Sequence, residues 1–167
     1  MFIRASDGTQ LYVRHVKPGD RDAIAAAWLK LSPRSQYRRF LAPKPRLTSR
    51  DLSYLTEIDG HDHVALAAFE MSESKRLVAV ARYVRLKDDP AAAEVAVTVA
   101  DDMQGKRIGK QLGVLLADEA RGRGVKRFTG ALVSDNRAAF RLMATMTDRL
   151  VSHIDHGVID VVADLAA

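Results

Sequence analysis

The sequence predicts a single α/β domain over residues 1–167, with a mixed central sheet of about six or seven strands and helices on both faces. Segments with the period of a strand alternate with segments with the period of a helix along nearly the whole chain. Hydrophobic residues make up 47% of the chain and charged residues 28%, which is typical of a globular protein in water. A chain of 167 residues is also the usual size of one domain with one core.

The first half of the chain reads as strands and helices separated by proline and glycine. Pro18 and Gly19 end the first strand, and Asp20 can cap a helix whose apolar residues recur every three or four positions. The polar turn at residues 72–75 joins two apolar runs into a β-hairpin. The expected elements are a strand over 11–16, a helix from Asp20 to Pro33, a basic and aromatic connection over 33–50, a helix capped by Thr48 or Ser49, and strands over 63–71 and 76–86.

The second half begins with a strand that we place at the centre of the sheet. Residues 93–102 are apolar on both faces apart from Glu94 and Thr98, as expected of a strand covered on both sides. The elements expected after it are a helix over 108–120 that ends at Gly122 and Gly124, a strand over 125–133, a helix over 137–146, and one or two strands that include 157–165.

Composition excludes several classes of function. The chain has no cysteine, which excludes disulfides, zinc–thiolate sites and a thiol nucleophile, and which is compatible with a cytoplasmic protein. No apolar run approaches the ~20 residues of a membrane span, and residues 1–16 lack a signal peptide's apolar region, so no membrane partner is expected. The histidines at 61–63 and 153–156 read as solvated loop residues, so we expect no metal.

The charge of the chain favours anionic partners. The formal net charge is +5, from 26 basic and 21 acidic residues. No segment carries a dense stripe of basic and aromatic side chains, so nucleic acid is not expected as a partner. The anion that the sequence does predict is a phosphate held by a loop.

That loop is DDMQGKRIGKQL, residues 101–112, which lies between the central strand and the next helix. It is neither an NTPase phosphate loop nor a G-x-G-x-x-G motif. The backbone N–H groups of a turn and of a first helical turn are unpaired, and with the helix dipole they form an anion site. Gly105 and Gly109 permit close approach, and the positive charge comes from Lys106, Arg107 and Lys110. A pyrophosphate fits such a site.

The segment QGKRIG within this loop resembles the Q/R-x-x-G-x-G/A signature of the GNAT superfamily, the Gcn5-related N-acetyltransferases. The order of elements matches that superfamily along nearly the whole chain. The closest resemblance is to the acetyltransferase domain of bacterial Pat-type protein lysine acetyltransferases. It rests on five phrases at consistent spacing: VRHVKPGDRDAI, LSPRSQYRRF, VAVARYVR, AEVAVTVADDMQGKRIGKQL and DNRAAFRLM.

The resemblance implies a role for each matching position. Acetyl-CoA is the implied co-substrate, with no metal and no covalent enzyme intermediate. Its pantetheine arm would pair with the central strand as an added strand does, its pyrophosphate would bind the loop amides, and a residue after the next strand would touch the pantetheine or the phosphates. The positions implied are, in that order, Val97, Thr98 and Val99; Gln104, Gly105, Lys106, Arg107, Ile108, Gly109 and Lys110; and Asn136.

Glu94 stands where Pat-type domains have their general base. A lysine amine has a pKa of about 10.4 and must lose a proton before it attacks a thioester, and a carboxylate can accept that proton. We expect Glu94 to be desolvated in its apolar strand, which would raise its pKa. The alternative is a structural carboxylate paired with Arg82 or Arg85 of the neighbouring strand.

Two of the positions at which the chain departs from the family pattern bear on the site. Arg107 replaces the first glycine of the signature, and we expect a helical backbone there because the residue falls at the predicted helix start. Met143 stands where many GNAT enzymes have the tyrosine that protonates the leaving thiolate. Two further assignments stay open: Asn136 can be only a helix cap, and residues 37–40 can line the site or form a solvated basic face with Tyr37 and Phe40 packed inward.

The sequence therefore predicts a GNAT fold and acetyl-CoA-dependent N-acetylation, with a protein lysine as the first-choice acceptor. A small-molecule amine is the alternative acceptor. A non-catalytic acyl-CoA-binding module is the alternative class, because a fold does not fix a function. The sequence leaves open whether the protein forms a homodimer.

Overall fold

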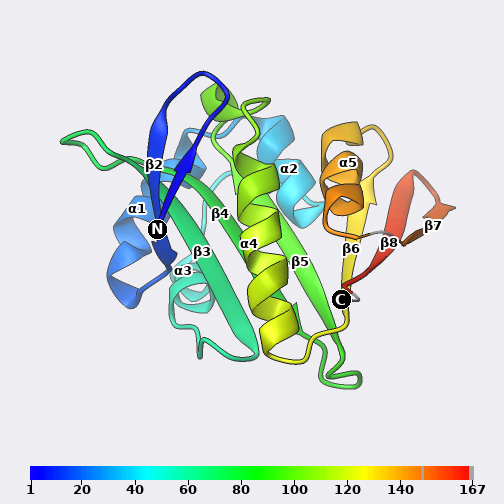
Figure 1. Cartoon of the computed structure of the whole chain (residues 1–167). Helices are drawn as coiled ribbons and strands as arrows, with labels where there is room; N and C mark the ends of the chain where they lie inside the picture. Colours follow the sequence, from blue (N-terminus) through cyan, green and yellow to red (C-terminus); the bar gives the residue numbers. More distant parts are fainter. Residues whose placement is uncertain (148, 166–167) are drawn as a thin grey trace.

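A mixed sheet of eight strands forms the centre of the computed structural model, which describes residues 1–147 and 149–165 (Figure 1). The strands lie in the order β1-β2-β3-β4-β5-β6-β8-β7. Within these residues every neighbouring pair is antiparallel except β5 and β6, which are parallel. The strands are β1 (Phe2–Arg4), β2 (Gln10–His15), β3 (His63–Glu70), β4 (Leu77–Arg85), β5 (Ala92–Val99), β6 (Arg127–Val133), β7 (Leu150–Asp155) and β8 (Val158–Asp164).

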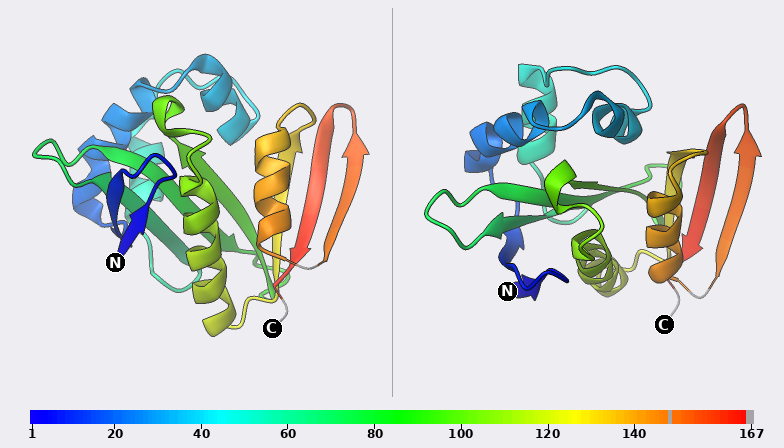
Figure 2. Two further views of the ribbon diagram at one scale, coloured as in Figure 1. Left: turned by 45° about the horizontal axis from the view of Figure 1, so that its top comes forward. Right: turned by 90° about the horizontal axis from the view of Figure 1, so that it is seen from above.

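Helices cover both faces of the sheet, as predicted. Figure 2 shows α1, α2 and α3 on one face and α4 and α5 on the other. The helices are α1 (Arg21–Leu29), α2 (Pro33–Phe40), α3 (Ser49–Thr56), α4 (Ile108–Gly122) and α5 (Arg137–Thr145), with short 3₁₀ turns η1 (Pro18–Asp20) and η2 (Asp101–Met103). In the described part of the chain, no helix combines the length and the apolar character that crossing a bilayer requires.

The predicted fold class is confirmed, but the sheet is larger than the six or seven strands expected. The additional strand is β1, which pairs with β2 through Ile3 and Leu11. Three residues are too few to show a period of two in the sequence, so nothing marked β1 as a strand. The C-terminal segment supplies two strands, the upper end of the range that we expected.

Residues 33–40 form a helix, which corrects the prediction of an irregular connection. Pro33 occupies the first position of α2, and Ser32 caps that helix by accepting a hydrogen bond from the Ser35 backbone at 3.2 Å. Proline suits this position because the first helical N–H has no partner within a helix. The proline that we expected to end α1 therefore begins α2, and α1 itself ends at Leu29.

The core lies mainly between α4 and the sheet. Ile108, Leu112 and Leu116 repeat along one side of α4 and are fully buried, as the helical spacing predicts. Each such side chain stabilises the fold by about 1.5–3 kcal/mol through its burial. Beneath them the rings of Tyr83 and Phe128 pack with their centroids 5.9 Å apart. This packing fixes the position of α4 over the middle of the sheet.

β5 and β6 separate part of the way along the sheet. Their parallel pairing covers only Ala92–Glu94 with Arg127–Thr129. Beyond it β5 continues to Val99 along β4, and β6 continues to Val133 along β8. We call this opening the fork. One edge of β5 therefore has no neighbouring strand after Glu94.

Candidate active site

A cleft of about 530 Å³ occupies the fork, and we call it the fork cleft. It is lined by β5, by the loop that leads into α4, by α5 and by the end of α2. Of the site residues predicted from the sequence, the cleft brings together all but one: Glu94, Val97, Thr98, Val99, Gln104, Gly105, Arg107, Ile108, Gly109, Lys110 and Asn136. The exception is Lys106.

One end of the fork cleft contains a run of unpaired backbone N–H groups. Within the described residues, no backbone N–H group from Gly105 to Lys110 has a hydrogen-bond partner. These groups surround the N-terminus of α4, a helix of 15 residues whose dipole adds a partial positive charge at that point. Unpaired N–H groups at a helix N-terminus are the usual setting for phosphate binding.

Arg107 adopts a left-handed backbone, so the predicted helical conformation is wrong. Its φ is 63° and its ψ is 11°, and it is the N-cap of α4 rather than part of the first turn. The chain needs this conformation because it enters the helix from a sharp turn, in which Gly105 also has a positive φ of 74°. An arginine in this region costs about 1–2 kcal/mol, which explains why a glycine suits the position.

The side chain of Lys106 does not face the cleft, which corrects the prediction that it adds charge there. Its Nζ lies 2.8 Å from Oδ2 of Asp7, in the turn between β1 and β2. The hydrogen bond from Lys106 is the main cause that holds the pKa of the Asp7 carboxyl well below its usual range. The backbone carbonyl of Lys106 accepts a further bond from Ser6 at 3.0 Å. Lys106 thus anchors the loop, and only its N–H group remains for an anion.

Gln104 also supports the loop rather than the anion. Its side-chain Nε2 donates to the carbonyl oxygen of Val99 at 3.0 Å and to Oδ1 of Asp101 at 3.2 Å. Its backbone N–H donates to the carbonyl oxygen of Asp101 at 3.3 Å, so the run of unpaired amides begins one residue later than predicted. Asp101 in turn accepts from the Ser32 backbone at 2.9 Å and from Ser35 Oγ at 2.7 Å, which ties α2 to the same loop.

Glu94 lies at the apex of the fork. It is the last residue of β5 that pairs with β6, opposite Thr129, and on the other side it pairs with Val84 of β4. We predicted a desolvated carboxylate, and this is wrong because the residue is exposed. The reason is that β6 separates from β5 at this point, so among the described residues no strand lies on that side of β5 after Glu94.

The alternative of a structural ion pair at Glu94 is not found. Among the described residues, neither Arg82 nor Arg85 pairs with it. The guanidinium of Arg82 bonds to Leu55 and His63. That of Arg85 bonds to backbone carbonyl groups and forms an ion pair with Asp62 at 2.9 Å. In this part of the chain the Glu94 carboxylate has no hydrogen-bond partner, so it is available to a proton donor in the cleft.

α5 provides the opposite wall of the fork cleft. Asn136 caps this helix, because its Oδ1 accepts a hydrogen bond from the Ala139 backbone at 3.3 Å. The capping role that we left open is therefore confirmed, while a contact with pantetheine remains a prediction. Met143 is buried in the wall, at the position where many relatives of this fold carry a tyrosine.

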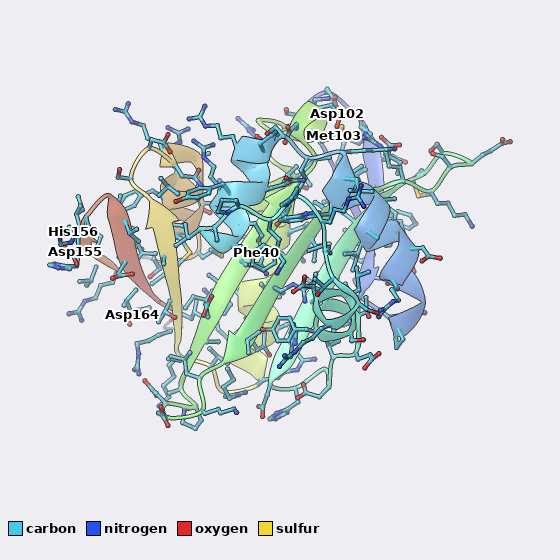
Figure 3. All side chains as sticks on the ribbon, turned by 180° about the vertical axis from the view of Figure 1, so that it is seen from behind. Phe40, Asp102, Met103, Asp155, His156 and Asp164 are labelled. Carbon is cyan, nitrogen blue, oxygen red and sulfur yellow. The ribbon has the colours of Figure 1, made fainter. Side chains whose placement is uncertain are left out.

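Residues 38–40 line the cleft, and the alternative of a solvated basic face is wrong. Arg38 and Arg39 are half-buried and turn inward, whereas Tyr37, which that alternative packed inward, is exposed. Phe40 packs on Trp28 with ring centroids 5.3 Å apart, and Figure 3 shows it over the sheet on the α1–α3 side. The signal for this helix was the pair Ser32–Pro33, a cap followed by a proline. Arg141 of α5 also lines the cleft and was missed.

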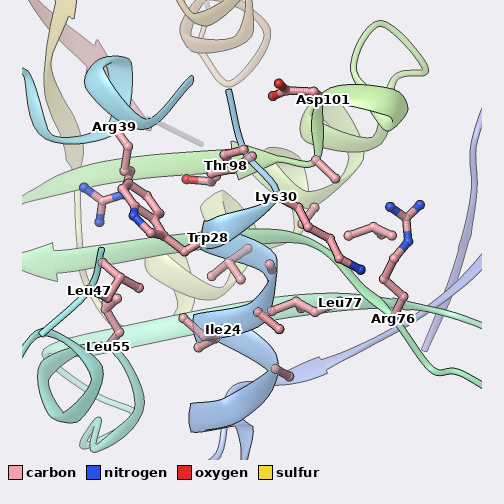
Figure 4. Close-up of a pocket in the computed structure, with 18 of the residues that line it drawn as sticks. Ile24, Trp28, Lys30, Arg39, Leu47, Leu55, Arg76, Leu77, Thr98 and Asp101 are labelled. Atoms are coloured by element: carbon pink, nitrogen blue, oxygen red, sulfur yellow. The ribbon is translucent and has the colours of Figure 1, made fainter. Parts of the chain in front are cut away.

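A second cleft of about 660 Å³ lies between α1 and the sheet, on the other face of β5 (Figure 4). We call it the α1 cleft. Its walls are mainly apolar and include Ile24, Trp28, Leu55 and Leu77. The two clefts share lining residues, namely Arg39, Phe40, Ala96 and Thr98. Both clefts reach β5, so a ligand in the fork cleft and a ligand in the α1 cleft could contact each other beside this strand. No group of three potential metal-ligating side chains occurs in the described part of the chain.

Comparison with known families matches residues 26–146 to the acetyltransferase (GNAT) family. Two curated relatives are similar to parts of the chain. The acetyltransferase Pat of Mycolicibacterium smegmatis is 36% identical over 110 residues, 66% of this chain and 32% of the relative. An acetyltransferase of Pseudomonas aeruginosa is 30% identical over 100 residues, 59% of this chain and 53% of the relative. The chain thus spans a third to a half of the curated relatives it matches.

Solved structures agree with this match. The GNAT domain of S. lividans PAT superposes with a TM-score of 0.87 at 29% identity, and the match covers 99% of this chain and 96% of that domain. A cAMP-binding acyltransferase from Mycobacterium smegmatis gives a TM-score of 0.70 at 31% identity and covers all of this chain but 47% of the other. A Salmonella typhimurium protein, solved with its cofactor acetyl-CoA, shares the fold with a TM-score of 0.71 at 18% identity.

Proposed function

Because the chain belongs to the acetyltransferase (GNAT) family, we propose that it transfers the acetyl group of acetyl-CoA to an amine, and that the amine is a protein lysine. One observation carries the proposal. The unpartnered carboxylate of Glu94 lies at the apex of a fork that has a free strand edge along one side and unpaired amides from Gly105 to Lys110. Acetyl transfer from acetyl-CoA requires three features: a base for the amine, a strand edge for the pantetheine arm and an anion site for the phosphates.

The fork cleft suits the shape and charge of acetyl-CoA. The pyrophosphate would accept hydrogen bonds from the amides at the start of α4, with Arg107 and Lys110 adding charge. The pantetheine amides would pair with the free edge of β5 along Val97–Val99, as an added strand does. This orientation brings the thioester towards Glu94, because β5 leads from the loop back to the apex.

The reaction needs one proton acceptor from the protein. The amine nitrogen attacks the thioester carbonyl carbon, a C–N bond forms, the C–S bond breaks, and the coenzyme A thiolate leaves. Glu94 accepts the proton that the attacking amine loses, directly or through a water molecule. N–H groups on the free edge of β5 polarise the carbonyl oxygen. Met143 has no proton to give, so the thiolate takes its proton from solvent.

A protein lysine is preferred over a small polyamine because of the charges in the α1 cleft. A polyamine pocket would be lined with free acids, whereas this cleft contains Arg39 and Arg82. Its acids, Asp101 and Asp102, are already bonded to serines of α2 and to Arg76. The resemblance of the sequence to Pat-type protein lysine acetyltransferases also supports this choice, and the similar proteins include an acetyltransferase Pat and a GNAT domain of PAT.

The test is acetyl transfer by the purified protein to a host protein extract, beside a Glu94→Gln variant and a no-enzyme control. We expect site-selective lysine acetylation by mass spectrometry that falls by about 10²–10⁴-fold in the variant, the range for losing a general base. Binding of coenzyme A should be equal in both proteins. Tight binding without acetylation of any lysine would contradict the protein-lysine acceptor, and equal rates would contradict the role of Glu94.

A further inference from the structure

The α1 cleft contains a buried arginine without a counter-ion. Arg82 of β4 is only 5% exposed. Its Nη1 donates to the carbonyl oxygen of Leu55 at 3.2 Å and contacts Nε2 of His63 at 2.9 Å. Within the described residues, its Nε and Nη2 have no hydrogen-bond partner and no carboxylate pairs with the group. A buried charge in this state is costly unless something binds it.

His63 does not neutralise this charge. A guanidinium has no acceptor atom, so Nε2 of His63 must accept the hydrogen bond and the ring must be neutral. Burial, and then the charge of Arg82, lowers the pKa of His63 to about 4. The partners of Arg82 are therefore two dipoles, the imidazole and the carbonyl group near the end of α3.

A second cation lies beside the first. Arg39 enters the same cleft from α2, as Figure 4 shows, and its guanidinium lies over the face of the Phe40 ring at 4.6 Å from the ring centroid. Among the described residues this guanidinium forms no ion pair, although the charge of Glu94 lies near enough to act on it. Burial lowers the pKa of Arg39. It also lowers that of Arg82, which the charge of Arg39 lowers further. Both guanidinium groups remain charged at neutral pH, because an arginine starts from a pKa above 12.

Three of the other charged groups that line the cleft already have partners, and the remaining two, Lys30 and Lys75, are exposed to solvent. Arg76 lies 2.7 Å from Glu70 and 2.9 Å from Asp102, so it carries two counter-ions. Asp101 accepts the hydrogen bonds from α2 that were described above. The positive charge that is shielded from solvent and lacks a counter-ion therefore lies at the end of the cleft that Arg39 and Arg82 line.

This end of the cleft lies next to the proposed base. Arg82 is directly opposite Ala96 in the pairing of β4 with β5, and Glu94 precedes Ala96 by two positions on the same face. Such diagonal neighbours are about 7–8 Å apart. Alanine at position 96 leaves space above the strand. An acceptor could therefore place its amine at Glu94 and another group at the two arginines.

We propose that the α1 cleft is the acceptor site and that Arg82 and Arg39 bind a carboxylate of the acceptor. The acceptor class is thus an amine with a nearby carboxylate, which in a protein is an Asp or Glu side chain close to the acetylated lysine. The inference rests on the proposed function for the position of the amine. Guanidinium groups match the planar shape of a carboxylate, and the ion pair offsets the cost of burying the Arg82 charge beside the half-buried Arg39.

The α1 cleft offers a direct readout of binding, since Trp28 lines it and is the only tryptophan of the chain. We would titrate the protein with tryptophan-free peptides that contain one lysine and either Glu or Gln at each neighbouring position in turn. Binding would be followed by Trp28 fluorescence, and acetyl transfer would be measured on the same peptides. A second arm compares 6-aminohexanoate with its amide, which separates a small acceptor from a peptide.

We expect the best Glu peptide to exceed its Gln partner by about tenfold or more in both binding and kcat/KM, the usual size of a charge-assisted hydrogen bond. Arg82→Met should bring this ratio to about one, as should Arg39→Met. Arg76→Met is the matched control and should keep the ratio, because that cation already has its own carboxylates. Thermal unfolding of each variant checks that it folds.

Each outcome bears on one of the two proposals. Equal binding of Glu and Gln peptides, or a ratio that survives both Arg82→Met and Arg39→Met, would overturn the carboxylate subsite. Preferred binding of acidic peptides without acetylation of any of them would support the subsite and count against the proposed transferase activity. A preference confined to 6-aminohexanoate would support the subsite and assign it to a small acceptor.

Discussion

The side chain of Gln104 donates a hydrogen bond of 3.0 Å to the carbonyl oxygen of Val99. This bond joins the loop at the start of α4 to the last residue of β5. The proposed phosphate site and the proposed pantetheine edge are therefore held in one fixed relation before any ligand arrives. Such preorganisation favours binding because less order has to be imposed on the protein.

Gln104→Ala should weaken the binding of coenzyme A by about fivefold. The variant removes hydrogen bonds whose net contribution is about 1 kcal/mol, while the unpaired amides that meet the pyrophosphate are kept. Isothermal titration calorimetry measures the affinity, and Gln111→Ala serves as a control that removes a glutamine from the first turn of α4, where its Nε2 donates to the carbonyl oxygen of Arg4. An unchanged Kd in Gln104→Ala would contradict the supporting role of this side chain.

Replacing Arg107 by Gly and by Ala tests its backbone conformation. Both variants remove the guanidinium, but only glycine tolerates the observed φ of 63° without strain. We expect the Gly variant to be more stable than the Ala variant by about 1 kcal/mol in urea unfolding. In a helical position the order is reversed, because alanine is favoured over glycine there by a similar amount. A more stable Ala variant would thus contradict the left-handed N-cap.

Arg82→Met should leave the free energy of unfolding unchanged or raise it by about 1–4 kcal/mol. Replacing an uncompensated buried charge by an apolar side chain of similar length removes a desolvation cost. Thermal and urea unfolding measure the change. A loss of several kcal/mol would show instead that Arg82 is a structural residue. A gain would be typical of a site that keeps a destabilising group for its function.

His63 should titrate near pH 4 in the folded protein, against about 6.5 in the unfolded chain. Because the unfolded chain then binds more protons between these values, stability should fall as the pH is lowered from about 6.5 to about 4. NMR titration of the ring protons gives the pKa, and Tm against pH gives the slope. His63→Gln should have a smaller slope in this window. In Arg82→Met the pKa of His63 should rise, since one of its causes is gone.

The sequence predicted those features that depend on short-range pattern. The stripe of Ile108, Leu112 and Leu116 predicted α4, and the turn before it predicted the run of unpaired N–H groups at the start of that helix. Two of the wrong predictions depend on where a helix begins or ends, to within a few residues. Pro33 can end one helix or begin the next. The backbone of Arg107 is left-handed because Arg107 is the N-cap of α4, whereas it would be helical if α4 began one residue earlier.

Other parts of the site depend on contacts between distant segments, which a local pattern does not contain. The partner of Lys106 is Asp7, in a turn near the start of the chain. The exposure of Glu94 follows from the separation of β5 and β6, two strands that are about 30 residues apart in the sequence. The two inward arginines of the α1 cleft come from α2 and β4, which only the fold brings together.

The fork also has a mechanical consequence. The strands β6, β8 and β7 form a wing that hydrogen-bonds to the rest of the sheet through three residue pairs, Ala92–Glu94 with Arg127–Thr129. The pantetheine arm of a co-substrate, bound to the free edge of β5, would add contacts beside this short pairing and restrict the movement of the wing relative to β5. A higher affinity for the co-substrate would then go with a lower mobility of the wing, and the protein with bound co-substrate would be more rigid than the free protein.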